Sequence, residues 1–150
     1  MKKALAMMTL VLVLGWGSTF ANNGQGISKQ TVAHFSKDFA QAKKVNWIKE
    51  NGYSIANFVL DGQILAAYYG DNAELIAVVH NILADRLPIF LLTSLKSSYQ
   101  DYWVSNLFES ANENESSYHL TLENANQVLV LRSVNSTDWI VVKKERKNLD

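Results

Sequence analysis

Cysteine is absent from the 150-residue chain, and proline occurs once. Without cysteine the chain cannot form disulfide bonds, thiolate metal sites or a lipid attachment at a cysteine. Long apolar runs are also missing: the longest mainly apolar stretch, residues 4–14, has about eleven residues, whereas a membrane-spanning helix needs about twenty. We therefore expect a domain stabilised by its apolar core, with no membrane span in the mature chain.

The chain also lacks an excess of charge of either sign, with 14 basic and 14 acidic side chains. Nucleic-acid binding requires clustered lysine and arginine, and the basic run at residues 143–147 is interrupted by Glu145. No glycine-rich phosphate-binding loop occurs in the sequence. These absences argue against nucleic acid as a partner.

Residues 1–21 have the three parts of a secretory signal peptide. Two lysines form a basic start, the apolar stretch follows, and a segment of small residues ends at Ala21. We expect cleavage near Ala21, which leaves residues 22–27 as a flexible leader and places the protein in the periplasm or outside the cell. Loss of the two lysines leaves 12 basic against 14 acidic groups, a net charge of about −2.

The first half of the mature chain reads as one helix followed by four strands. Apolar residues at three- and four-residue steps predict an amphipathic helix over residues 29–41, with Ser28 as its N-cap. Beyond this helix the period changes to two, and the dipeptides at 51–52 and 61–62, Asn-Gly and Asp-Gly, favour tight hairpins. The expected strands are 45–47, 53–60, 63–69 and 74–82.

The second half repeats this order. Pro88 suits the first turn of a helix, and Leu92, Leu95 and Tyr99 continue the helical spacing. A shift of 60 positions places the first apolar stripe on the second, and a shift of 65 places the later strands of the two halves on one another, so that Tyr53 falls on Tyr118. The expected strands are 103–109, 118–122, 127–134 and 139–144.

The predicted fold is therefore α+β, with two tandem helix–four-strand meander repeats. The meanders join into one antiparallel sheet of about eight strands, and the two helices lie on one face of it. We expect a single duplicated domain over residues 28–147, with repeat one at 28–84 and repeat two at 85–147.

Two helices on one face leave the other face of the sheet without a cover. The strands carry apolar residues at both odd and even positions, which point to opposite faces of the sheet. We therefore expect Tyr53, Leu65 and Tyr69 to face the helices and another set to face away. That outer set is a candidate binding surface. The alternative is that a strand bulge reverses which side chains face outward, or that edge loops or the leader segment cover this face, so that these side chains belong to the core. The candidate binding residues are Ile48, Phe58, Tyr68 and Ile76.

The sequence offers no pattern that predicts catalysis, a metal site or a cofactor. The histidines, His34, His80 and His119, stand in a helix and two different strands without ligand-like spacing. No serine stands in a nucleophile-elbow pattern, and the aspartates fit turn chemistry. We therefore expect a protein that is not an enzyme.

A further pattern is formed by Phe35, Phe39, Ala42, Val45, Trp47, Tyr53, Leu87, Pro88 and Tyr99. This pattern resembles PepSY-like domains that are similar to beta-lactamase-inhibitor protein, an exported bacterial family common in Bacteroidetes. The resemblance implies two tandem repeats and a sheet whose open face can bind a protein, and it carries over no functional residue. We expect a protein or peptide partner at that face. A small molecule or an envelope polymer is the first alternative, and an enzyme with an unrecognised site is the second.

Overall fold

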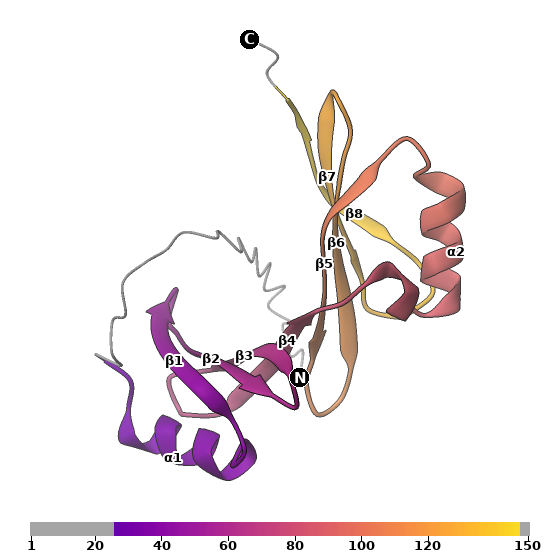
Figure 1. The fold of residues 1–150 in the computed structure, drawn as a ribbon. Helices are drawn as coiled ribbons and strands as arrows, with labels where there is room; N and C mark the ends of the chain where they lie inside the picture. The colour runs from indigo at the N-terminus through magenta and orange to yellow at the C-terminus, as the bar shows by residue number, and fades with distance from the viewer. Residues whose placement is uncertain (1–25, 148–150) are drawn as a thin grey trace, which may run out of the picture.

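The computed structural model describes residues 26–147, and the signal peptide, the cleavage site at Ala21 and most of the expected leader lie outside them. Eight strands form one antiparallel sheet in chain order, from β1 at one edge to β8 at the other. One α-helix precedes each group of four strands (Figure 1). The elements are α1 (Lys29–Asp38), β1 (Lys43–Glu50), β2 (Tyr53–Leu60), β3 (Gln63–Tyr69), β4 (Leu75–Asn81), a 3₁₀ turn (Ala84–Arg86), α2 (Ile89–Ser98), β5 (Trp103–Ala111), β6 (Ser116–Glu123), β7 (Gln127–Ser133) and β8 (Ile140–Arg146).

The fold predicted from the sequence is confirmed in both repeats. Ser28 caps α1, because its hydroxyl accepts a hydrogen bond from the backbone N–H of Thr31 at 3.0 Å. Positive φ angles at Asn51 and Gly52 close the hairpin between β1 and β2. Among the described residues, no helix is long and apolar enough to cross a membrane.

Each helix packs its apolar stripe on its own four strands. On α1, Phe35 is 4 % exposed and lies against Trp47, Phe58 and Tyr69 of the sheet. Aromatic rings at 5–7 Å in tilted or edge-on arrangements add to the stabilisation that burial gives. The corresponding core under α2 is aliphatic and contains Leu87, Leu91, Leu95, Leu107, Leu120, Leu122, Leu129 and Leu131.

The duplication extends to the strand register. The pair Ser54 and Tyr69 recurs 64 positions later as Tyr118 and Ser133. The offset of 65 expected from the sequence is therefore wrong by one residue for these strands. Because side chains alternate between the two faces of a strand, this error exchanges the faces, and Tyr53 has no structural counterpart in Tyr118.

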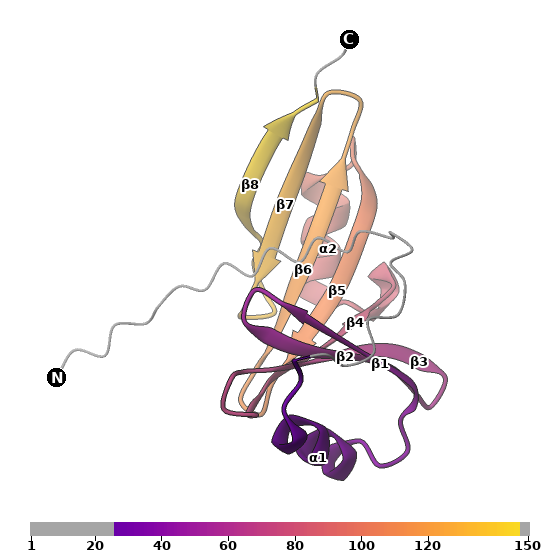
Figure 2. The ribbon, with the colours of Figure 1, turned by 90° about the vertical axis from the view of Figure 1, so that its left-hand side faces the viewer.

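The sheet bends strongly where the two repeats meet. Only the second half of β4 pairs with β5, from Val78 opposite Ala111 to Asn81 opposite Phe108. Figures 1 and 2 show α1 below the first four strands and α2 behind the last four, so both helices lie on the outside of the bend. The face without helices lies on the inside of the bend, and we call it the open face.

Candidate binding face

The open face of repeat one is a buried apolar cluster. We call it the inner cluster; its buried members are Ile55 of β2, Tyr68 of β3, Val79 of β4 and Phe108 of β5. Each of these four side chains is 4–5 % exposed. The bend brings Phe108 of repeat two onto repeat one, so the inner cluster joins the repeats. Ile48, Tyr53 and Ala66 pack around it and are partly buried.

Phe58 does not belong to the open face. It lies directly opposite Leu65 in the ladder between β2 and β3, and residues opposite one another share a face. Its ring is 2 % exposed and packs against Phe35 of α1 and against Phe39, the C-cap residue of that helix, at centroid distances of 5.0 and 4.8 Å. The expectation that Phe58 faces away from the helices is wrong.

The expectation for Tyr53 is wrong in the opposite sense. The sequence places it under the helices, but its ring meets Tyr68 on the open face at 6.2 Å. The expectation that Leu65 and Tyr69 face the helices is confirmed, because both belong to the core cluster that contains Phe35 of α1. The dipeptide Asp61-Gly62 at the tip of the hairpin sets this register, with φ angles of 50° and 80°.

The other three candidate residues differ in how far they are buried. Tyr68 is buried, and desolvation first and the charge of Glu50 second raise the pKa of its hydroxyl to about 12. Ile48 is partly buried at the margin of the inner cluster. Ile76 has no partner in β3, because the ladder passes from Leu75 to Ala77 at a β-bulge, and it is 37 % exposed.

The open face of repeat two is more accessible and more polar. His119 of β6 stacks on Phe108 with a centroid distance of 4.6 Å and an interplanar angle of 5°. Arg132 of β7 lies opposite His119, and Val130 lies opposite Thr121. All four of these β6 and β7 side chains are half-exposed. The sequence reasoning missed them because it searched only strands β1–β4 for outward-facing side chains.

His119 gives the protein a pH-dependent stability of definite sign. Burial first, and the positive charge of Arg132 second, lower its pKa from 6.5 to about 4. The unfolded chain binds a proton below about pH 6.5, while the folded chain keeps this imidazole neutral. The free energy of unfolding is expected to lose roughly 1–2 kcal/mol from this group between pH 6.5 and 4, after allowance for solvent screening.

Urea unfolding at pH 7 and pH 4.5 measures this loss in the wild type and in His119→Gln. Carboxylates contribute equally to the pH dependence of both proteins, so the difference between them isolates the imidazole. The drop in stability should be smaller in His119→Gln. Equal drops in the two proteins would contradict the assignment.

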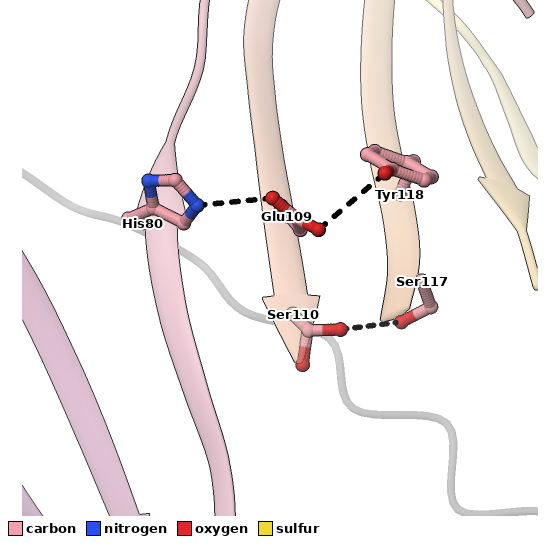
Figure 3. A network of polar contacts seen from close by, with 5 residues as sticks. All are labelled: His80, Glu109, Ser110, Ser117 and Tyr118. Atoms are coloured by element: carbon pink, nitrogen blue, oxygen red, sulfur yellow. Dashed lines mark hydrogen bonds and ion pairs between the residues drawn. The ribbon is translucent and has the colours of Figure 1, made fainter. Parts of the chain in front are cut away.

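A second polar group lies on the helix side of the sheet, at the junction of the repeats. Figure 3 shows His80 and Tyr118 on either side of Glu109. The His80 Nε2 atom lies 3.1 Å from one carboxylate oxygen, and the Tyr118 hydroxyl donates to the other at 3.4 Å. Desolvation first and Glu109 second raise the pKa of Tyr118. This network links β4, β5 and β6 and therefore holds the two repeats in register.

Neither polar group has the arrangement of a hydrolytic site. The Ser117 hydroxyl lies 3.2 Å from His119 Nε2, but it donates to the Ser110 carbonyl at 3.4 Å. In this geometry the Ser117 hydroxyl hydrogen is directed at a backbone carbonyl and not at the imidazole, unlike the hydroxyl of an activated serine. His34 contacts the Ala73 carbonyl at 2.8 Å. In the described part of the chain, no three histidine, aspartate or glutamate side chains are grouped to hold a metal ion.

An open groove lies where β4 and β5 separate. Residues 81–84 and 104–107 line it, and its volume is about 370 Å³. None of these lining residues is aromatic, so the groove does not supply the aromatic ligand site that a small-molecule binder on the open face would need.

The fold matches solved structures of Bacteroides proteins. A DUF2874 family protein from Bacteroides uniformis aligns with a TM-score of 0.68 and 14 % identity over 79 % of this chain and 88 % of that one. A BLIP-like protein from Bacteroides fragilis aligns with a TM-score of 0.66 and 19 % identity over 79 % of this chain and 85 % of that one. The resemblance to BLIP-like domains is therefore confirmed at the level of the fold.

A third match comes from Bacteroides eggerthii, a protein assigned provisionally to the periplasm. Its TM-score is 0.69, with 14 % identity over 79 % of this chain and 88 % of that one. Neither protein-family models nor curated proteins match the sequence. At these identities the likeness describes the fold and not a shared ligand or partner.

Proposed function

We propose that this protein is an exported, non-catalytic domain that binds a protein or peptide through the open face of its sheet. The observation that carries the proposal is the accessible part of that face in repeat two. Val128, Val130 and Arg132 alternate along β7 on the side away from α2, and all three are half-exposed. A partner with an apolar surface would bury them together.

Several features favour binding over catalysis. The polar groups at His80 and His119 serve packing and strand register, as their contacts describe. The similar structure from Bacteroides fragilis carries the name BLIP-like, after an inhibitor protein, which supports a binding role.

Export is the second part of the proposal. It is supported by the signal-like sequence of residues 1–21 and by the provisional periplasmic assignment of the protein from Bacteroides eggerthii. The exported unit would be the duplicated domain over residues 28–147.

A pull-down from envelope extract tests the binding proposal. The variant Val128→Gln with Val130→Gln makes the face polar without changing its charge. Val141→Gln is the matched control, because Val141 lies opposite Leu131 on the helix side and is 48 % exposed. The wild type and the control should retain the same protein, and the double variant should lose it while keeping its melting temperature.

Retention of the same protein by all three would contradict the proposal. Retention of an envelope polymer in place of a protein would contradict it as well, and would favour the alternative class of ligand.

A further inference from the structure

Arg132, in the middle of the open face of repeat two, is a cation that has no acidic partner among residues 26–147. Its Nε atom is buried and has no hydrogen-bond acceptor. Within residues 26–147 its guanidinium forms no ion pair. Burying part of a charged group without a partner costs free energy, and such a group needs an explanation.

Nearby carboxylates of the same sheet are engaged elsewhere. Glu145 forms an ion pair with Lys143 at 2.6 Å, and Glu123 forms one with Lys147 at 2.8 Å. The hydrogen bonds of Lys147 and Ser105 lower the pKa of Glu123, which therefore stays ionised and paired. The protein thus neutralises these lysines itself but leaves Arg132 unneutralised.

The duplication shows that a cation is not needed for the fold at this position. Arg132 occupies in repeat two the position that Tyr68 occupies in repeat one, because the offset of β2 and β3 onto β6 and β7 is 64. Repeat one fills the position with a side chain that packs in the inner cluster. Repeat two has instead placed a guanidinium beside two accessible apolar side chains, Val130 and Ile140.

We propose that the partner of the open face presents an aspartate or glutamate side chain to Arg132, with an apolar side chain beside it against Val130 and Ile140. The inference rests on the proposed function and names the chemistry of the partner. A carboxylate and a guanidinium form charge-assisted hydrogen bonds of matched planar geometry. Lys143, which lies opposite Val130 on the same face, is already paired with Glu145, so Arg132 is the cation left to be neutralised there. One unpaired charge fits a single acidic side chain better than the repeated phosphates of a nucleic acid.

The neighbours of Arg132 favour this partner further. His119 lies opposite it and stays neutral at physiological pH because burial and Arg132 lower its pKa. A neutral imidazole stacked on Phe108 adds no charge of its own, so the guanidinium of Arg132 supplies the positive charge at this point of the face. Ile140 is 58 % exposed and supplies an apolar surface next to the charge.

A random dodecapeptide display library selected against the folded wild-type protein supplies the probe. Enriched peptides are synthesised with a fluorescent label and an amidated C-terminus, so that any required carboxylate comes from a side chain. Their dissociation constants are then measured for the wild type, Arg132→Gln, Arg132→Lys and Lys144→Gln. Lys144 is the matched control, because it lies opposite Leu129 on the helix side of the sheet and is exposed.

Enriched peptides should contain an acidic residue next to an apolar one. Arg132→Gln should weaken binding by about ten- to one hundred-fold, and Lys144→Gln should leave it unchanged. Arg132→Lys should bind with an intermediate constant, because it keeps the charge and loses the planar donor pair. Replacing the acidic residue of the peptide by its amide should weaken wild-type binding and have little further effect in Arg132→Gln.

Two results overturn the inference and differ in what they say of the proposed function. The carboxylate partner is refuted if the enriched peptides lack an acidic residue, or if the dissociation constant of Arg132→Gln stays within two-fold of the wild-type value. In that case, a loss of binding in the Val128 and Val130 double variant would still support the open face as the binding site. Selection of peptides whose binding survives that double variant, or no enrichment at all, would refute both.

Discussion

Replacing Phe58 with alanine is expected to lower the free energy of unfolding by about 3–5 kcal/mol. The ring is 2 % exposed and packs against Phe35 of α1 and the C-cap residue Phe39 on the helix side of β2. Its removal deletes the apolar surface between helix and sheet and leaves a cavity in a core built of rigid rings. Urea unfolding followed by circular dichroism measures the change.

Phe90 is the matched control for this substitution. It lies on α2 and is 66 % exposed, so Phe90→Ala should change the free energy of unfolding by no more than about 0.5 kcal/mol. A similar small change in Phe58→Ala would mean that Phe58 lies on the surface, as the sequence suggested.

Phe108→Ala tests whether the inner cluster is a true core, and a loss of about 3–5 kcal/mol is expected. Phe108 is 5 % exposed, packs with residues of β2, β3 and β4, and stacks on His119. Because it belongs to repeat two and packs on repeat one, its loss should also loosen the junction of the repeats. Hydrogen exchange of the β4 and β5 backbone amides reports on that junction.

The two phenylalanines separate the two faces of one sheet. If the open face were an exposed recognition surface throughout, Phe108→Ala would cost less than about 1 kcal/mol while Phe58→Ala kept its large effect. Comparable losses in both would establish that the bend buries the open face of repeat one.

These placements change how binding should be tested. Tyr68 and Phe58 are both buried, so polar substitutions at either position would unfold the protein and remove any partner indirectly. Val130 and Arg132 are half-exposed and can be changed with the fold intact. A binding experiment on this protein therefore belongs on β7.

Much of the secondary structure could be predicted from local chemistry. The strands expected at 53–60 and 63–69 match β2 and β3, because an Asp-Gly turn between two alternating runs fixes both ends. The helix expected over 29–41 ends earlier, at Asp38, because Phe39 leaves the helical conformation with φ −126° and ψ 53°. The strand expected at 118–122 is longer in the structure, because it pairs along its whole length with β5.

The candidate site was harder to predict, because apolar residues occur at both parities of β2 and β3. Alternation alone cannot say which parity faces the helices when both faces are buried. The hairpin register decides it, and Phe58 opposite Leu65 then joins the helix side.

The sequence alone determined the order of helices and strands, the duplication and the antiparallel pairing, because these depend on local turns and on the spacing of apolar residues. Only the tertiary structure decided which parity is core, where the sheet bends, and which repeat offers an accessible surface. The physical reason is that side-chain burial depends on the partner strand and on the angle at β4 and β5, and both arise from contacts between residues distant in the chain.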